Sequence, residues 1–194
     1  MRITAIVNDS PAEVEGHFSD VIYFQGCSKN CGYCFNPELQ DPDEGLEVDY
    51  DYIQSHLSEL SDVVVLTGGE PLDQKGTLAL ICALKVEGKK VVLETSVVGT
   101  EWSYADKVLY SIKTFDPPSV SVLFGLHQYT NVIPVVVLGH EWFKKKTFAA
   151  IVRIMEGDLW FRYYNDTHCD LTDVYRIIKR EGKKIRELKK INVD

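Results

Sequence analysis

One stretch decides the fold: Val63-Val64-Val65-Leu66-Thr67-Gly68-Gly69-Glu70-Pro71. Its unbroken apolar start is typical of a strand that is buried on both faces, as the strands of parallel sheets are. The glycine pair and the proline then end the strand. Similar runs recur along the chain, and the strands we expect are Ile3–Val7, Val21–Phe24, Val63–Leu66, Val91–Thr95, Val108–Ile112, Val132–Leu138 and Ala149–Met155.

Helical patterns alternate with these strands. They cover about residues 49–60 and 75–87, a shorter stretch near 140–147, and Leu171–Lys190 with an interruption around Gly182. This alternation predicts an α/β fold with right-handed crossovers. The 194 residues are too few for a closed eight-fold barrel of about 250 residues. We therefore expect a partial, open barrel that forms a single domain over residues 1–194.

Composition excludes several classes of function. A net charge of −8 argues against broad electrostatic binding to nucleic acid. No apolar run approaches the roughly 18–20 residues that span a bilayer, and the first residues lack the apolar segment of a signal peptide. We therefore expect a cytoplasmic protein without a membrane or nucleic-acid partner. In that compartment thiols stay reduced, so clustered cysteines indicate metal rather than disulfides.

The cysteines cluster in the stretch Tyr23-Phe24-Gln25-Gly26-Cys27-Ser28-Lys29-Asn30-Cys31-Gly32-Tyr33-Cys34-Phe35-Asn36-Pro37-Glu38. The C-x3-C-x2-C spacing lets one loop wrap three thiolates around an iron–sulfur core. Three ligands would leave one iron of a four-iron cluster open to a substrate or cofactor. The alternative is a structural zinc site, which needs a fourth ligand such as His17 or Cys169 from elsewhere in the chain.

The triplet Cys27, Cys31 and Cys34, with an aromatic residue (Tyr33) before the last cysteine, resembles the signature of the radical S-adenosylmethionine (SAM) superfamily. The resemblance implies that the three cysteines hold a [4Fe–4S] cluster whose free iron binds SAM. An electron from the cluster then cleaves SAM to methionine and a 5′-deoxyadenosyl radical. It also implies an open (β/α)6-type barrel, as in small radical SAM enzymes.

Polar residues at the ends of later strands complete the predicted site. Gly68-Gly69-Glu70-Pro71 is similar to the family's GGEP motif, which implies contact of Gly68, Gly69 and Glu70 with the methionyl amino group of SAM. In open α/β sheets, ligands bind outside the carboxyl ends of the strands. Two further strand ends therefore supply candidates, namely Glu94 and Thr95 for the ribose or the substrate, and Ser111 and Lys113, with Lys113 placed to pair with a carboxylate.

The flanks of the triplet indicate the substrate. Phe-Gln-Gly-Cys before it and Tyr-Cys-Phe-Asn-Pro-Glu after it resemble the glycyl-radical-enzyme activases, closest to the activating component of anaerobic ribonucleoside-triphosphate reductase. Asn36 belongs to this flank and is added to the predicted cofactor-binding residues. The resemblance implies a glycyl-radical reductase as protein substrate and a flavodoxin- or ferredoxin-type electron donor.

A second resemblance remains open. The activases often carry Asp-x-Lys where this chain has Ser111-Ile112-Lys113. Leu-Thr-Gly-Gly-Glu-Pro-Leu, Leu-Glu-Thr and Ser-x-Lys together are similar to 7-carboxy-7-deazaguanine synthase, which rearranges 6-carboxytetrahydropterin with SAM and Mg²⁺. That enzyme usually has Asp-Thr after the third cysteine, where this chain has Phe35-Asn36. On these motifs we favour the activase over the synthase.

The other candidates for chemistry are expected in structural roles. Cys82 is expected to be buried in a helix and Cys169 to be a free thiol, while His17, His127 and His140 are expected in surface or structural positions and Trp102, Trp142 and Trp160 in packing.

Overall fold

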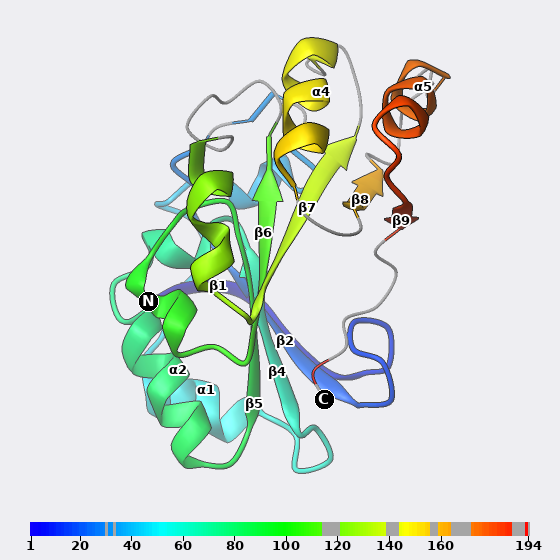
Figure 1. The fold of residues 1–194 in the computed structure, drawn as a ribbon. Helices are drawn as coiled ribbons and strands as arrows, with labels where there is room; N and C mark the ends of the chain where they lie inside the picture. Colours follow the sequence, from blue (N-terminus) through cyan, green and yellow to red (C-terminus); the bar gives the residue numbers. More distant parts are fainter. Residues whose placement is uncertain are drawn as a thin grey trace.

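Figure 1 shows the fold as a computed structural model, which describes residues 1–29, 31–32, 34–113, 121–138, 144–155, 159–163, 172–187 and 193. The described strands form one sheet in the order β3-β1-β2-β4-β5-β6-β7-β8-β9. Their bounds are β1 Arg2–Ser10, β2 Ser19–Phe24, β3 Leu46–Glu47, β4 Val63–Gly68, β5 Lys90–Thr95, β6 Lys107–Ile112, β7 Val132–Leu138, β8 Leu159–Tyr163 and β9 Ile185–Glu187.

The sheet is parallel from β2 to β9, and within the described residues its edge strands β3 and β9 do not pair with each other. This open α/β sheet confirms the predicted partial barrel. The first strand differs from the prediction, since β1 runs antiparallel to β2. The loop between them is too short for the crossover that a parallel pair requires.

The helices are α1 (Tyr50–His56), α2 (Thr77–Val86), α4 (Lys145–Ile154) and α5 (Thr172–Arg180). Short 3-10 turns lie at η1 (Pro37–Leu39), η2 (Pro71–Asp73), η3 (Thr100–Ser103) and η4 (Val122–Gln128). The side chain of Asp49 caps α1 by accepting the Tyr52 N–H at 2.9 Å. Side by side in Figure 1, α1 and α2 are joined by a 2.6 Å hydrogen bond from Tyr50 to Glu87. No helix in the described part of the chain is long and apolar enough to cross a membrane.

The two faces of the sheet carry different cores because side chains alternate along each strand. On the outer face, Val64, Leu66 and Leu93 pack with buried residues of the helices. The inner face carries a smaller valine-rich cluster, with Val21, Val65 and Val92 in register across β2, β4 and β5. The inward positions at the carboxyl ends of the same strands are polar or aromatic, and these line the site described below.

The C-terminal third departs from the prediction. Ala149–Met155 was expected as a strand but lies mostly in α4, because Phe148, Ile151 and Val152 are buried at helical spacing. The predicted helix Leu171–Lys190 ends at Arg180, and the chain then turns at Gly182 (φ 65°) into β9. The helix expected near 140–147 falls partly outside the described residues. No element was expected over residues 156–170, where the structure has β8.

The structural residues are placed as follows. Cys82 was expected to be buried but is exposed, because α2 buries its other side through Leu80, Ile81 and Leu84. The Trp102 ring is fully buried, 5.1 Å from the Tyr110 ring. His17 pairs with Asp62 at 2.7 Å, and Trp160 packs against the valine-rich cluster of the inner face. For His127 only the backbone, in η4, is described. The other three residues lie outside the described part of the chain, namely His140, Trp142 and Cys169.

Candidate active site

The cysteine loop leaves the carboxyl end of β2 and is tied to its own return segment. The Gly26 N–H donates to the Leu39 carbonyl at 2.8 Å, and the Cys27 N–H donates to the Gln40 carbonyl at 3.1 Å. The Gln40 side chain donates to the Cys31 carbonyl at 3.2 Å. These bonds close the loop at its base and hold the three cysteines at the end of the sheet where polar residues gather.

A cavity of about 470 Å³ lies between this loop and the carboxyl ends of the strands. Its volume falls in the range of small-molecule and cofactor sites. Every predicted site residue except Tyr33, which lies outside the described residues, lines this cavity. They are Cys27, Cys31, Cys34, Asn36, Gly68, Gly69, Glu70, Glu94, Thr95, Ser111 and Lys113.

The glycine pair is required by the backbone around it. Gly68 has φ +111°, and a Cβ there would approach the Phe24 backbone closer than 3.0 Å. A Cβ on Gly69 would approach the Gly26 carbonyl equally closely. The Gly69 N–H donates to the Phe24 carbonyl at 2.8 Å, and the Glu70 N–H donates to the Gly26 carbonyl at 2.9 Å. The glycines therefore let the end of β4 pack directly against the start of the cysteine loop.

The Glu70 carboxylate is buried and bound by protein donors. It accepts the Ser96 N–H at 2.9 Å, the Ser96 hydroxyl at 3.0 Å and the Leu72 N–H at 3.1 Å, and the Thr95 hydroxyl also donates to it. Burial raises the pKa of Glu70, and these hydrogen bonds oppose that shift. Glu70 thus links the end of β4 to the end of β5 through its hydrogen bonds with Thr95 and Ser96.

A charged pair that the sequence did not indicate crosses the inner face. Arg162 on β8 binds Glu94 on β5 through two hydrogen bonds, at 2.6 and 3.1 Å, and Thr67 donates to Glu94 at 3.0 Å. This fork geometry is the strongest form of carboxylate pairing. The aromatic residues of Leu159–Tyr163 were the signal that could have revealed the strand, although Arg162 lies 68 residues from Glu94 in the sequence.

Breaking this pair is expected to destabilise the fold. Arg162→Leu would leave the Glu94 carboxylate, only 15% exposed, without its partner. Because the Arg162 side chain is 33% exposed, we expect the loss in unfolding free energy to be about 2 kcal/mol rather than the full cost of a buried pair. Urea unfolding measures it. The double variant Glu94→Gln/Arg162→Leu should recover at least half of the loss, and equal losses in the single and double variants would contradict the pairing.

Glu13 and Tyr23 also line the cavity and were not predicted. Burial raises the pKa of the Glu13 carboxyl, the negative charge of Glu94 raises it further, and Arg162 opposes the shift. Burial likewise raises the pKa of Tyr23, helped by the charges of Glu13 and Glu94. Glu13 lies in the loop between β1 and β2, which offers no pattern from which a cavity residue could be identified.

The raised pKa of Glu13 predicts a pH-dependent stability. A carboxyl whose pKa is higher in the folded state favours the folded protein most at low pH, where it is neutral. The stability of the wild type relative to Glu13→Gln should therefore fall as the pH rises from about 4.5 through the raised pKa, and then level off. Urea unfolding of both proteins between about pH 4.5 and pH 8 tests this. A difference that stays constant, or that rises with pH, would contradict it.

The donor chemistry of the loop fits an iron–sulfur cluster. Three thiols from one short loop line one cavity, and thiolates are the usual ligands of such clusters. Burial raises the pKa of the Cys27 thiol, a Lys29 backbone hydrogen bond opposes the shift, and the nearby Glu70 carboxylate adds to it. Among the described residues no three His, Cys, Asp or Glu side chains converge on one ion. The fit therefore rests on the shared loop and cavity.

Comparison with known proteins agrees with this geometry. Residues 21–156 match the profile of the Radical SAM superfamily, a span that covers well over half of the chain. The matched span includes the three cysteines, the glycine pair and the ends of the next three strands.

Two curated relatives share sequence with this chain. A 7-carboxy-7-deazaguanine synthase from Rhodopirellula baltica is 34% identical over 94 residues, 48% of this chain and 37% of that protein. A 7-carboxy-7-deazaguanine synthase from Chlorobaculum tepidum is 36% identical over 70 residues, 36% of this chain and 31% of that protein. The chain thus matches about a third of the length of each of these relatives.

Two solved structures share the fold. SuiB of Streptococcus suis bound to S-adenosylmethionine superposes with a TM-score of 0.56 at 12% identity, covering 86% of this chain and 51% of that one. TYW1 with a lysine-pyruvate adduct superposes with a TM-score of 0.60 at 10% identity, covering 86% of this chain and 74% of that one.

Proposed function

Because the chain belongs to the radical SAM superfamily, we propose that it generates a substrate radical on a small pterin-like heterocycle, as a 7-carboxy-7-deazaguanine synthase-type enzyme. The cofactors of this family are a [4Fe–4S] cluster and SAM. When bound, the reduced cluster supplies the electron that cleaves SAM to the 5′-deoxyadenosyl radical. The observation that carries the proposed substrate is the similarity to two synthases, at 34% identity over 94 residues and 36% over 70 residues.

The motifs alone favoured the activase over the synthase, whereas the proposed substrate is that of the synthase. The flank after Cys34 favoured a glycyl-radical-enzyme activase, but the curated relatives carry the name of the alternative. The cavity supports a small polar substrate, because Glu13, Glu94, Arg162 and Lys113 surround it with charges of both signs. Such groups recognise a heterocycle rich in hydrogen-bond donors and acceptors, whereas a glycine backbone offers few.

Each predicted site residue has a proposed role. Cys27, Cys31 and Cys34 ligate the cluster, while Gly68 and Gly69 set the backbone that faces the amino group of SAM. Glu70 and Thr95 fix this backbone through their mutual hydrogen bond. The residues proposed to meet the ribose or the substrate are Tyr33, Asn36, Glu94, Ser111 and Lys113. We propose further that residues 1–194 act as one domain and receive electrons from a flavodoxin- or ferredoxin-type donor.

Two assays on the reconstituted protein test the proposal. Reduction in the presence of SAM should release 5′-deoxyadenosine, and addition of 6-carboxytetrahydropterin with Mg²⁺ should yield a deazapurine. SAM cleavage without any turnover of the pterin would overturn the substrate proposal. Incubation with an anaerobic ribonucleotide reductase is the comparison, since a glycyl radical signal on that partner would favour the activase instead.

A further inference from the structure

Two glutamine side chains behind the cavity connect the two halves of the site. Gln25 follows β2, one residue before the cysteine loop begins, and only 2% of it is exposed. Its amide nitrogen donates to the Glu38 carbonyl at 3.0 Å and to the Asp41 carbonyl at 2.8 Å. Its amide oxygen accepts the Thr4 hydroxyl. The Gln25 side chain therefore fixes the return arm of the cysteine loop against β1.

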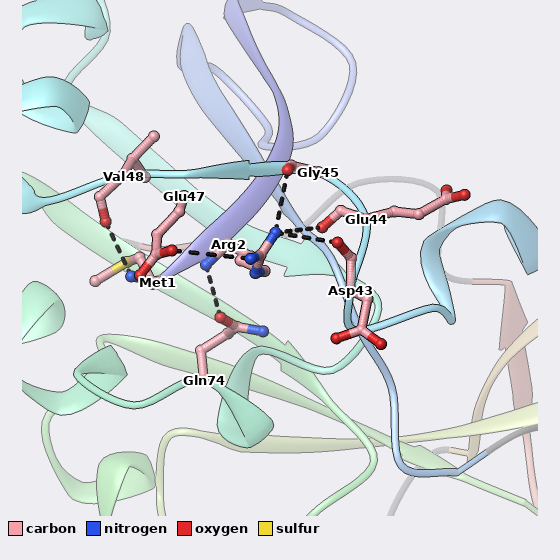
Figure 2. Close-up of polar contacts among 8 residues, drawn as sticks. All are labelled: Met1, Arg2, Asp43, Glu44, Gly45, Glu47, Val48 and Gln74. Atoms are coloured by element: carbon pink, nitrogen blue, oxygen red, sulfur yellow. Dashed lines mark hydrogen bonds and ion pairs between the residues drawn. The ribbon is translucent and has the colours of Figure 1, made fainter.

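Gln74 makes the second connection, from the turn after Gly68–Pro71. Its amide nitrogen donates to the main-chain carbonyl of Gln25 at 2.6 Å, and its amide oxygen accepts the main-chain N–H of Arg2 at 2.8 Å. Figure 2 shows the contact between Gln74 and Arg2 beside the Arg2 guanidinium, which donates to the carbonyls of Asp43, Glu44 and Gly45. The two amides thus join β1, the base of the cysteine loop, its return arm and the segment after the glycine pair.

Only an amide satisfies these partners. The groups facing the Gln25 nitrogen are carbonyl oxygens, which accept but cannot donate, so the orientation of the amide is fixed. A carboxylate there would face two acceptors, and an apolar side chain would leave both carbonyls without this donor in a partly buried place. The slot is also closed by packing, since a Cβ on Gly45 would lie within 3.0 Å of the Gln25 side chain and the Ile3 carbonyl.

We propose that the side-chain amides of Gln25 and Gln74 together position the cysteine loop relative to the Gly68–Pro71 segment, and so align SAM with the cluster. Neither side chain lines the cavity, so both are positioning residues. The proposal needs only the superfamily's two cofactors. It does not depend on which substrate the radical attacks, which separates it from the proposed function.

The test compares Gln25→Glu, Gln74→Glu and the control Gln54→Glu. Gln54 lies on α1, is exposed and donates to Glu87, so its variant makes the same change of charge away from the site. Each reconstituted protein is assayed for iron and sulfide content, for SAM affinity per loaded cluster, and for the change that SAM causes in the EPR spectrum of the reduced cluster. Substitutions in the outer shell of a metal site typically cost 10- to 100-fold in affinity or activity.

We expect Gln25→Glu to weaken SAM binding by about 10- to 100-fold and to reduce the SAM-dependent EPR change. Gln74→Glu keeps its acceptor for Arg2 and loses only one donor, so its loss should be smaller. It also keeps the test decisive if Gln25→Glu does not fold. The positioning role is overturned if the cluster-loaded variants bind SAM as tightly as Gln54→Glu does, even where their unfolding temperatures fall. Wild-type protein that binds SAM but converts no pterin would overturn only the proposed substrate.

Discussion

Cys31→Ala is expected to abolish 5′-deoxyadenosine formation, reducing it to the rate of protein without a cluster. Cys31 lies in the middle of the loop, lines the cavity and has its backbone held by the Gln40 side chain. Removal of one of three thiolates leaves two irons of a four-iron core without protein ligands, and the core has no other thiol in this loop to recruit. The measurements are iron and sulfide content after anaerobic reconstitution and 5′-deoxyadenosine release after reduction.

Cys82→Ala is the matched control for this experiment. Cys82 is exposed on α2, outside the cavity. Its replacement removes one thiol without touching the loop, so cluster content and SAM cleavage should both match the wild type. If Cys31→Ala retains a full cluster, or if Cys82→Ala loses it, the assignment of the three loop cysteines as ligands fails.

Gly69→Ala is expected to have the second largest effect, on both stability and the site. The added Cβ would approach the Gly26 carbonyl and the Leu39 carbonyl closer than 3.0 Å, and neither is the end of a flexible side chain. The cysteine loop would have to move away from β4, which costs about 3 kcal/mol of unfolding free energy. Because Gly26 directly precedes Cys27, the movement should also lower cluster content. Urea unfolding and iron analysis measure the two effects.

Gly88→Ala separates this clash from a general intolerance of substituted glycines. Gly88 has φ +82°, and a Cβ there would meet nothing within 4 Å. Its replacement should cost only the backbone strain of a left-handed alanine, about 1 kcal/mol. Its cluster content should match the wild type. Equal losses of stability in the two variants would contradict the proposed close packing of β4 against the cysteine loop.

Much of the site could be predicted because its residues sit at the ends of strands that the sequence makes recognisable. Unbroken apolar runs identify β2, β4, β5, β6 and β7, and parallel strands bring their carboxyl ends to one edge of the sheet. Polar residues that follow such runs must therefore meet in space. Strand ends alone therefore bring Gly69, Glu94 and Ser111 together with the cysteines around one cavity.

The C-terminal elements were harder to predict because their local patterns are ambiguous. The run Ala149–Met155 is apolar enough for a strand, and only packing against the sheet shows that Phe148, Ile151 and Val152 form one face of α4. Likewise, β8 carries large aromatic residues and an arginine, which do not form the unbroken aliphatic run of the earlier strands.

The sequence by itself indicated the cofactor chemistry, because the cysteine triplet and the Gly68–Pro71 segment together resemble two motifs of the superfamily, whereas the spacing of the thiols alone leaves a zinc site open. It also determined the open α/β class, since apolar runs set the strands. Only the tertiary structure decided which further charges enter the cavity and how the charges pair. Arg162 meets Glu94 across 68 residues, and Glu13 enters from a loop without a pattern, because such contacts depend on how the sheet curves. The same holds for Gln25 and Gln74, 49 residues apart, because the Gln74 side chain reaches the main-chain carbonyl of Gln25 only when the cysteine loop and the glycine segment fold against each other.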